Sequence, residues 1–449
     1  MRIAIVAPSA AFAESAGARI RYRRLIDAAP AGTIAMTPID ALAEADAYLF
    51  SKTYQSAAPA LAYSLAARGK RVALDVFDDY FSDPRDTRMA RFRHWFDEMA
   101  RAVHRVTVST PALADRLEPR LPARPLVIPD PAAPIDPAAL AATLRRKAEA
   151  MDPDALEILW FGIASNPYFE AGLGDLAAFA GALGAAGTRH RLTILTNAAG
   201  AKEEALAALA KAPVPVRWAE WSEAAEAEAL ARADVAVLPV GSGPFVTAKS
   251  LNRAITALSA GTQVLSLGAP LYAPLDTFLY RDLETLIADA RCGSLRLRWS
   301  RAAWLIDKLD RVASAADGAR RLAAMFEAIA PEPRPPHAVI LGEGAERDLV
   351  AASGALTIGF DDAADIALGA LGDAIHLSPA ARAQLAPAHR SGATLAPASL
   401  GLAVPPPLSG HGVVDLVRQR ERFGAARAAA AALLPDHAVF LAHDGLLAP

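Results

Sequence analysis

The stretch "ADVAVLPVGSGPFVTAKSLNRAITALSAGTQVL", residues Ala233–Leu265, contains a complete repeating unit of an α/β fold. Its apolar run Val235–Pro239 predicts a strand, and the glycine-containing segment after it predicts a turn. A mostly apolar stretch then predicts a helix from about Thr247, and the run Gln263–Ser266 predicts the next strand. A strand, a helix and a strand in this order form a βαβ unit, in which the two strands are parallel.

The same alternation continues through most of the 449 residues. The strands expected before this unit are Arg2–Ala7, Ala47–Ser51, Arg71–Val76, Arg105–Ser109 and Pro125–Pro129, and then Leu156–Phe161, Arg191–Thr196 and Val214–Trp218. A proline-rich segment, "PDPAAPIDP" (Pro129–Pro137), separates the two series. We therefore predict an α/β protein with two doubly wound, Rossmann-like domains, each built on a parallel sheet.

Two proline-rich segments divide the chain into four parts. Residues 1–130 form the first domain, 131–152 a linker and helix, and 153–330 the second domain. A second proline-rich segment, "PEPRPP" (Pro331–Pro336), precedes a smaller α/β module at 337–449. Two such domains joined by a hinge leave a cleft between the carboxyl ends of their strands, which suits a substrate made of two parts.

Composition narrows the classes of function. The net charge is −3, so no global field favours nucleic acid as a partner. The single cysteine, Cys292, excludes an intramolecular disulfide and a cysteine-based metal cage, and it fits a reducing, cytoplasmic location. No stretch approaches the roughly 18–20 apolar residues of a membrane span. Peripheral docking at the inner membrane stays open.

Six segments follow one another along the chain, and their order as a set is more specific than any one of them. They are "SAGARIRYRRL" (Ser15–Leu25), "GKRVALDVFDDYF" (Gly69–Phe81), "VTVSTPALADRL" (Val106–Leu117), "VIPDP" (Val127–Pro131), "ILWFGIASNP" (Ile158–Pro167) and "ADVAVLPV" (Ala233–Val240). The series resembles the bacterial GT-B-fold glycosyltransferases, in particular family 1/4-like members associated with polysaccharides. The resemblance covers about residues 1–280 and leaves out the C-terminal module.

This resemblance implies a metal-independent glycosyltransferase of the hexosyltransferase type, acting in surface polysaccharide synthesis. The first domain would bind a glycan or lipid-linked acceptor, and the second would bind a nucleotide-sugar donor, which is a substrate and not a cofactor. Two glutamates typical of many retaining members fall on Ala248 and Thr256, so the stereochemistry stays open. A sugar-nucleotide epimerase and a non-catalytic scaffold in a polysaccharide assembly complex are the alternatives.

The predicted donor site is the start of the helix near Thr247. A helix N-terminus exposes unpaired N–H groups and a partial positive charge, which favour phosphate. The side chains expected at the diphosphate are Lys249, Ser250, Asn252 and Arg253, with the two cations four residues apart on one helix face. The alternative is a solvated helix face. Loops expected around the nucleotide contain Gly162, Ser165, Asn166, Thr196 and Asn197.

Three carboxylates mark the end of the strand Arg71–Val76. Adjacent carboxylates raise one another's pKa, so Asp78 or Asp79 is the candidate general base on an acceptor hydroxyl. Helix capping or solvation of the strand end is the alternative for both. The residues expected to line the cleft on the acceptor side are Arg19, Arg21, Arg23, Lys52 and Asp75. If the first of these stretches is helical, Arg19 and Arg23 share a face.

Overall fold

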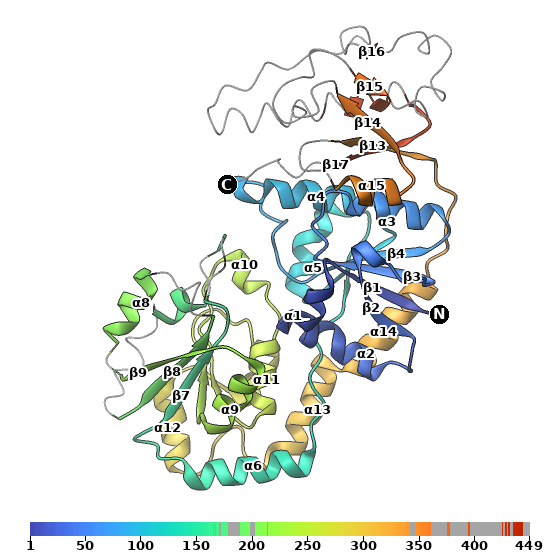
Figure 1. Ribbon diagram of the computed structural model, residues 1–449. Helices are drawn as coiled ribbons and strands as arrows, with labels where there is room; N and C mark the ends of the chain where they lie inside the picture. Colours follow the sequence, from blue (N-terminus) through green and yellow to red (C-terminus); the bar gives the residue numbers. More distant parts are fainter. Residues whose placement is uncertain are drawn as a thin grey trace.

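The computed structural model describes residues 1–164, 166, 168–169, 172–177, 189–197, 203–212, 214–341, 346–360, 375–377, 394–395, 424, 427–428, 430–431 and 434–442. Ser165, expected in a nucleotide loop, lies outside these residues. The described residues form three sheets (Figure 1), two of which have six strands each.

The first domain is a six-stranded parallel sheet in the order β2-β1-β3-β4-β5-β6. Its strands are β1 (Ile3–Ala7), β2 (Ile34–Pro38), β3 (Ala47–Ser51), β4 (Arg71–Val76), β5 (Arg105–Val108) and β6 (Leu126–Val127). Its helices are α1 (Ala16–Ala18), the π-helical turn η2 (Arg19–Arg23), α2 (Arg24–Ala28), α3 (Ala58–Ala67), α4 (Ala90–Ala102) and α5 (Pro111–Leu117). Helices cover both faces of the sheet, so its strands are nearly continuous apolar runs.

The second domain repeats this design in the order β12-β11-β10-β7-β8-β9. Its strands are β7 (Glu157–Phe161), β8 (Arg191–Thr196), β9 (Val216–Glu220), β10 (Val235–Val237), β11 (Gln263–Leu265) and β12 (Leu279–Tyr280). Its helices include α6 (Pro137–Ala150), α8 (Glu203–Ala210), α9 (Glu223–Arg232), α10 (Pro244–Thr247), α11 (Asn252–Ser259), α12 (Leu283–Arg291), the 3₁₀ turn η8 (Trp299–Arg301) and α13 (Ala302–Ala313). The next helix, α14 (Ala315–Glu327), packs on the first domain. The prediction of two parallel, Rossmann-like sheets is confirmed.

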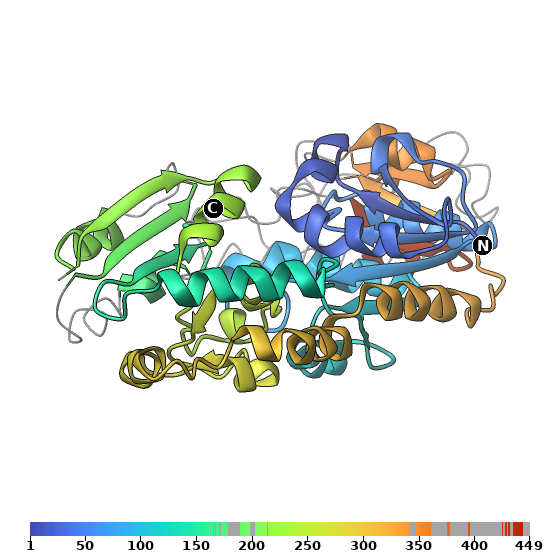
Figure 2. The ribbon, with the colours of Figure 1, turned by 90° about the horizontal axis from the view of Figure 1, so that it is seen from below.

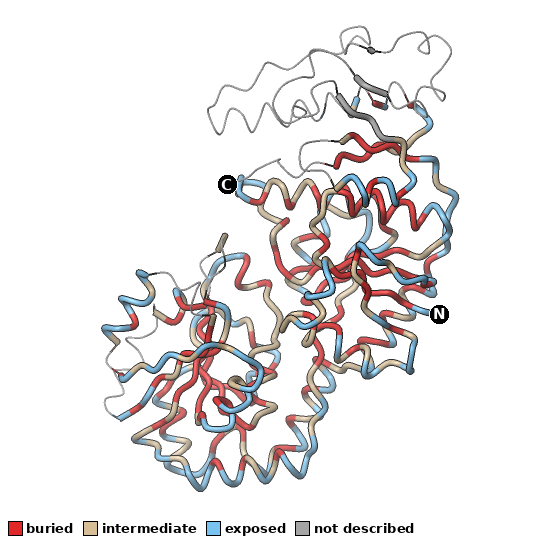
Figure 3. Tube along the Cα trace, in the orientation of Figure 1, coloured by how far each residue is buried: buried red, intermediate tan, exposed pale blue. Residues whose placement is uncertain are grey.

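In each sheet the strand order reverses at one strand, so that strands that follow it in the chain lie on either side of it. In the first sheet β1 lies between β2 and β3, and in the second β7 lies between β10 and β8. Parallel α/β sheets bind ligands beside the carboxyl ends of the strands at such switch points. Lys52 directly follows β3 and Gly162 directly follows β7, so both lie at these edges. Both sheets are buried along most of their strands (Figure 3).

The chain crosses between the domains twice. The first crossing leads from β6 into α6, and the second leads from α13 into α14 (Figure 2). The two crossings are joined where the Ala132 backbone N–H donates to the Ala313 carbonyl at 2.8 Å. Beyond the second crossing, Leu322 and Phe326 of α14 are buried against the first domain together with Leu25 of α2.

The third sheet has the order β16-β15-β14-β13-β17 and belongs to the predicted C-terminal module. Its parallel strands are β13 (His337–Leu341), β14 (Leu356–Phe360) and β17 (Ala438–Ala442), and its antiparallel strands are β15 (Ile375–Leu377) and β16 (Thr394–Leu395). Val339 and Phe440 share one hydrophobic core with α3 and α4 of the first domain. The hydroxyl of Ser56 also donates to Glu346, just before α15 (Arg347–Ala352), at 2.6 Å.

The stretch that contains Arg19 and Arg23 is helical: it consists of α1, the π-helical turn η2 and α2. The hydrogen bonds of a π-helical turn close over five residues, so the helix is wider there than in its α-helical parts. The two arginines have separate partners, Arg19 with Glu223 on α9 and Arg23 with Glu14.

Candidate functional site

Asp78 lies between two lysines that come from different domains. Its carboxylate is 2.9 Å from Lys52 Nζ and 2.5 Å from Lys249 Nζ. Lys52 has a positive φ of 51°, a conformation that costs energy in residues other than glycine. Each ammonium also lies 4.2 Å from the centre of an aromatic ring, Phe77 for Lys52 and Phe245 for Lys249. One carboxylate thus joins the two domains through two partly desolvated cations.

The electrostatics of Asp78 differ from the prediction. Burial favours the neutral acid, but the charges and hydrogen bonds of Lys249 and Lys52 outweigh it and lower the pKa of Asp78 to about 2. The expected rise in pKa from a neighbouring carboxylate is therefore wrong for Asp78. With both oxygens in ion pairs, Asp78 is ionised and weakly basic in this arrangement.

Asp79 has a separate set of partners. Its side chain accepts hydrogen bonds from the Ser82 hydroxyl at 2.6 Å and from the Ser82 backbone N–H at 3.0 Å, and it pairs with Arg116 at 3.3 Å. Arg116 reaches across the interface and donates to the Thr247 hydroxyl at 2.8 Å and to the Pro244 carbonyl. Asp79 therefore shapes its own turn and orients a residue that holds the domains together. Arg116 is an interface residue that cannot be recognised in the sequence, because nothing distinguishes it from other arginines on helix surfaces.

The predicted helix from Thr247 is two helices, α10 and α11, separated by Ala248–Leu251. The Thr110 side chain caps α5 and also donates to the Ala248 carbonyl at 2.9 Å. A residue of the first domain thus binds a carbonyl at the end of α10. Lys249 and Ser250 therefore lie in the break, and the predicted common helix face for Lys249 and Arg253 is wrong.

Arg253 instead meets the loop after β7. A Cβ atom placed on Gly162 would lie only 3.1 Å from a guanidinium nitrogen of Arg253, so this close approach depends on glycine. Asn197 accepts a hydrogen bond from the Ala164 backbone at 2.9 Å and lies 3.3 Å from the hydroxyl of Thr196, which ties the loops after β7 and β8 together. The predicted nucleotide-loop residues Gly162, Thr196 and Asn197 are thus neighbours.

Asn166 and Asn252 complete the predicted donor set. Asn166 accepts from the Tyr168 backbone N–H at 2.9 Å, and its amide lies 3.3 Å from the hydroxyl of Tyr80 in the first domain. Asn252 is the first residue of α11. The structure therefore places Asn166 at the domain interface and Asn252 beside Arg253.

Arg21 and Asp75 form a closed network inside the first domain. Arg21 donates to the two Asp75 oxygens at 2.6 and 2.8 Å, and also to the Ile128 carbonyl and to Asp130. Tyr22 and Thr107 each donate to Asp75 at 2.5 Å. Burial would raise the pKa of Asp75, but the charge and hydrogen bonds of Arg21 hold it below the usual value. At 2% and 3% exposure these two side chains are interior, contrary to their predicted place at a cleft.

The other two predicted arginines lie at the surface of the same segment. Arg19 forms ion pairs with Glu223 at 3.2 Å and Glu226 at 3.6 Å, both on α9 of the second domain. Arg23 is 53% exposed and lies 3.9 Å from Glu14. Arg19 therefore contributes to the domain interface, and Arg23 does not.

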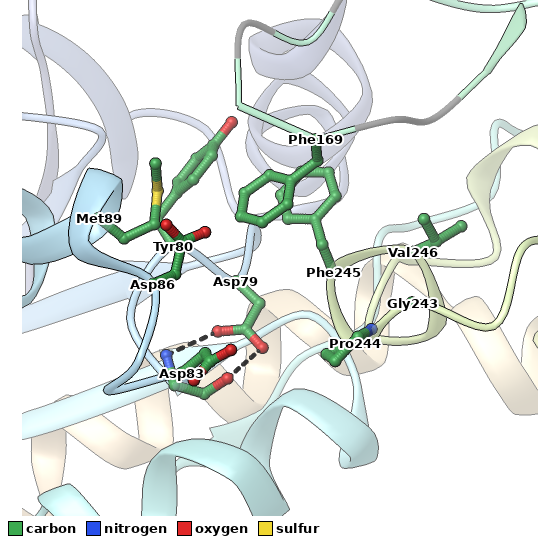
Figure 4. Close-up of a pocket in the computed structure, with 11 residues that line it drawn as sticks. Asp79, Tyr80, Asp83, Asp86, Met89, Phe169, Gly243, Pro244, Phe245 and Val246 are labelled. Carbon is green, nitrogen blue, oxygen red and sulfur yellow. Dashed lines mark hydrogen bonds between the residues drawn. The ribbon is translucent and has the colours of Figure 1, made fainter. Parts of the chain in front are cut away.

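A cavity of about 220 Å³ opens beside Asp79, between the domains (Figure 4). Its lining is Asp79, Tyr80, Ser82, Asp83, Asp86 and Met89 from the first domain and Phe169, Gly243, Pro244, Phe245 and Val246 from the second. Phe169 and Phe245 stack with their ring centres 4.1 Å apart. The combination of an aromatic wall with carboxylates on the opposite side can bind a polar molecule that has an apolar face.

Within the described residues, no three His, Cys, Asp or Glu side chains are grouped so that they could hold a metal ion. Within the same part of the chain, every helix is too short or too polar to cross a bilayer.

No protein-family model matches the chain, and no curated protein matches it in sequence. Solved structures do match in fold. Trehalose-6-phosphate synthase OtsA aligns with a TM-score of 0.51 and 12% identity over 74% of this chain and 100% of its own. A structure of the E. coli trehalose-6-phosphate protein bound with UDP-2-fluoro glucose gives the same values. The likeness concerns the fold: this chain has two Rossmann-like domains arranged as in the GT-B glycosyltransferases.

Proposed function

We propose that this protein is a glycosyltransferase that moves a sugar from a nucleotide-sugar donor to a hydroxyl of a glycan or lipid-linked acceptor, in surface polysaccharide synthesis. The observation that carries the proposal is the convergence of Lys52 and Lys249, from two domains, on the single carboxylate of Asp78. Two ammonium groups that meet on one carboxylate would suit the oxygens of a diphosphate, which would take the place of the Asp78 carboxylate between them.

The donor would bind along the switch point of the second sheet. Arg253 beside Gly162 supplies a guanidinium at the loop after β7, and Lys249 supplies an ammonium nearer the first domain. These cations would stabilise the diphosphate as its negative charge grows on leaving. Ser250 and Asn252 flank them in the chain and are proposed as hydrogen-bonding partners.

Donor binding would also activate the base. The lysines hold the pKa of Asp78 low, while its burial acts in the opposite direction. A diphosphate that neutralises Lys52 and Lys249 leaves burial as the larger influence, so the pKa of Asp78 rises. Asp78 then becomes able to accept the proton of an acceptor hydroxyl. Asp79, with its bonds to Ser82 and Arg116, is the weaker candidate for this role.

Titration calorimetry against a panel of nucleoside diphosphates and their sugars tests the proposal. We expect binding of at least one donor, and roughly a hundredfold weaker binding when Lys249→Ala and Arg253→Ala are combined, as for two lost charge-assisted contacts. Arg23→Ala is the matched control, because Arg23 is 53% exposed and pairs with Glu14 of its own domain. Donor binding that survives the double substitution would remove the diphosphate site.

Product analysis separates the alternatives. A transferase needs an acceptor, whereas an epimerase turns over the nucleotide-sugar alone. A non-catalytic scaffold is the second candidate, and it is favoured because the interface carboxylates already have partners, Asp78 in Lys52 and Lys249 and Asp79 in Arg116. A scaffold would show neither donor turnover nor a donor-dependent change in the two domains.

A further inference from the structure

The start of helix α3 has no cap from its own N-cap residue. Ala57 occupies that position and offers no side-chain oxygen to the unpaired N–H groups of the first turn. Instead, the Glu346 carboxylate accepts hydrogen bonds from the Ala57 backbone N–H at 3.2 Å and from the Ser56 hydroxyl at 2.6 Å. Glu346 lies 289 positions after Ala57, in the C-terminal module. A carboxylate of the module therefore does what the N-cap residue of α3 cannot do, at a helix end that favours negative charge.

The C-terminal module contacts α3 at more than this one point. Helix α15, which begins directly after Glu346, packs beside α3 (Figure 1). Val350 of α15 belongs to the same hydrophobic core as Ala60 and Leu61 of α3. Tyr63 of α3 donates its hydroxyl to the Pro335 carbonyl at 3.1 Å. Because these contacts fix the module on α3, Glu346 is held in place beside the start of the helix.

The segment between β3 and α3, residues 52–57, leads from Glu346 to the cleft. It begins with Lys52, which has a φ of 51° and pairs with Asp78 at 2.9 Å. A positive φ in a residue other than glycine persists only where the surrounding structure holds it. The Tyr54 backbone N–H donates to the Lys52 carbonyl at 2.9 Å, which closes a tight turn. This segment, called loop 52–57 below, is therefore held by β3 at one end and by the capped start of α3 at the other.

We propose that Glu346 is a positioning residue: by capping α3 it fixes loop 52–57 and thereby holds the Lys52 ammonium at Asp78. Loss of the Glu346 carboxylate releases the far end of the loop, so Lys52 can relax from its positive φ and its ammonium can leave the cleft. The C-terminal module then contributes to donor affinity without touching the donor. This last consequence rests on the proposed function, in which Lys52 binds the diphosphate.

Two measurements without donor test the proposal on the full chain. In Glu346→Ala, amide hydrogen exchange in loop 52–57 should become about tenfold faster, as for one lost charge-assisted hydrogen bond. Amine labelling with acetic anhydride should become faster at Lys52, which loses its fixed ion pair, and stay unchanged at the exposed Lys211. Mass spectrometry reads both rates. Glu346→Gln keeps an acceptor oxygen and should restore most of the original values.

Asp348→Ala is the matched control, because Asp348 is an exposed carboxylate in the first turn of α15, two residues after Glu346. It should change neither rate. Ser56→Ala removes one of the two hydrogen bonds from the side of the loop and should raise both rates by a smaller factor, which tests the proposal even if Glu346→Ala unfolds. Unchanged rates in the folded Glu346 and Ser56 variants, or equal rises in Asp348→Ala, would overturn it.

A double-mutant cycle on donor binding tests the route through Lys52. Glu346→Ala should weaken donor binding about five- to tenfold in the unaltered protein and have no further effect when combined with Lys52→Ala. Equal losses in both backgrounds would mean that Glu346 acts on the fold in general, which would refute a positioning role. If the unaltered protein binds no donor, the proposed function fails instead, and the exchange and labelling rates still decide whether Glu346 holds Lys52.

Discussion

Asp75 and Asp78 lie three residues apart at the end of β4, and both are buried carboxylates with a lowered pKa. Asp75 is held by groups of its own domain, of which Arg21 is only 2% exposed. Asp78 is held by lysines from two domains, whose side chains are 28% and 34% exposed. The same chemistry therefore builds a permanent part of the interior in the first case and a separable contact in the second.

A lowered pKa alone therefore does not identify a functional carboxylate. The ion pair at Asp75 cannot exchange with solvent or ligand unless the domain opens. The pairs at Asp78 can exchange, because water and ligand reach both lysines. The following predictions test this difference.

Removing Arg21, the buried partner of Asp75, should have the largest effect, and this effect is on stability. Arg21→Met keeps much of the side-chain volume but leaves Asp75 without its cation, so we expect a loss of about 3–5 kcal/mol in the free energy of unfolding. Urea denaturation measures it. Arg23→Met, on the same π-helical turn and exposed, should change stability by no more than about 0.5 kcal/mol. Similar losses in both variants would contradict the distinction between the two carboxylates.

Asp78→Asn should affect turnover more than folding. The amide keeps the shape of the side chain but cannot accept a proton, so transfer should fall about 10²–10³-fold while donor binding is kept or strengthened. Initial rates and calorimetry on the same preparation measure the two effects. Asp79→Asn is the companion variant, and a larger loss of transfer there than in Asp78→Asn would move the base to Asp79.

The smallest expected effect is on the stability of the protein at acid pH. Since the pKa of Asp78 is about 2 in the folded protein and near 3.8 in the unfolded chain, its contribution to stability is present above about pH 4. It is lost as the pH falls toward 2, and it amounts to about 2 kcal/mol. Urea titrations across this range should show a shallower loss for Asp78→Asn than for the unaltered protein. Parallel curves would mean that the two lysine contacts do not persist in solution.

The sequence predicted much of the fold because its signals are local. The strands Ala47–Ser51 and Arg71–Val76 occur at the predicted residues, since buried apolar runs determine them. β2 was missed because its five residues mix threonine and proline with apolar residues.

The candidate site depended on signals that are not local. Lys249 was expected on a helix because nothing near it in the sequence shows that Thr110, 138 positions before Ala248, binds the Ala248 carbonyl. The pairing of Asp78 with Lys249 spans 171 positions, and only the folded arrangement of two domains brings them together. The types of residue at the site were therefore predictable, whereas their partners, and so their pKa values, were not.

The two crossings between the domains have a mechanical consequence. They meet at the hydrogen bond between Ala132 and Ala313, so the two connecting segments form one hinge between the domains. Two adjacent connections allow rotation about the hinge but resist twisting and sliding of one domain relative to the other. A domain opening would then be a rotation about this hinge, with small displacements near Ala132 and Ala313 and larger ones farther away. Cleavage of one crossing by a protease would leave the domains connected but free to twist, so ordered motion would be lost before the protein came apart.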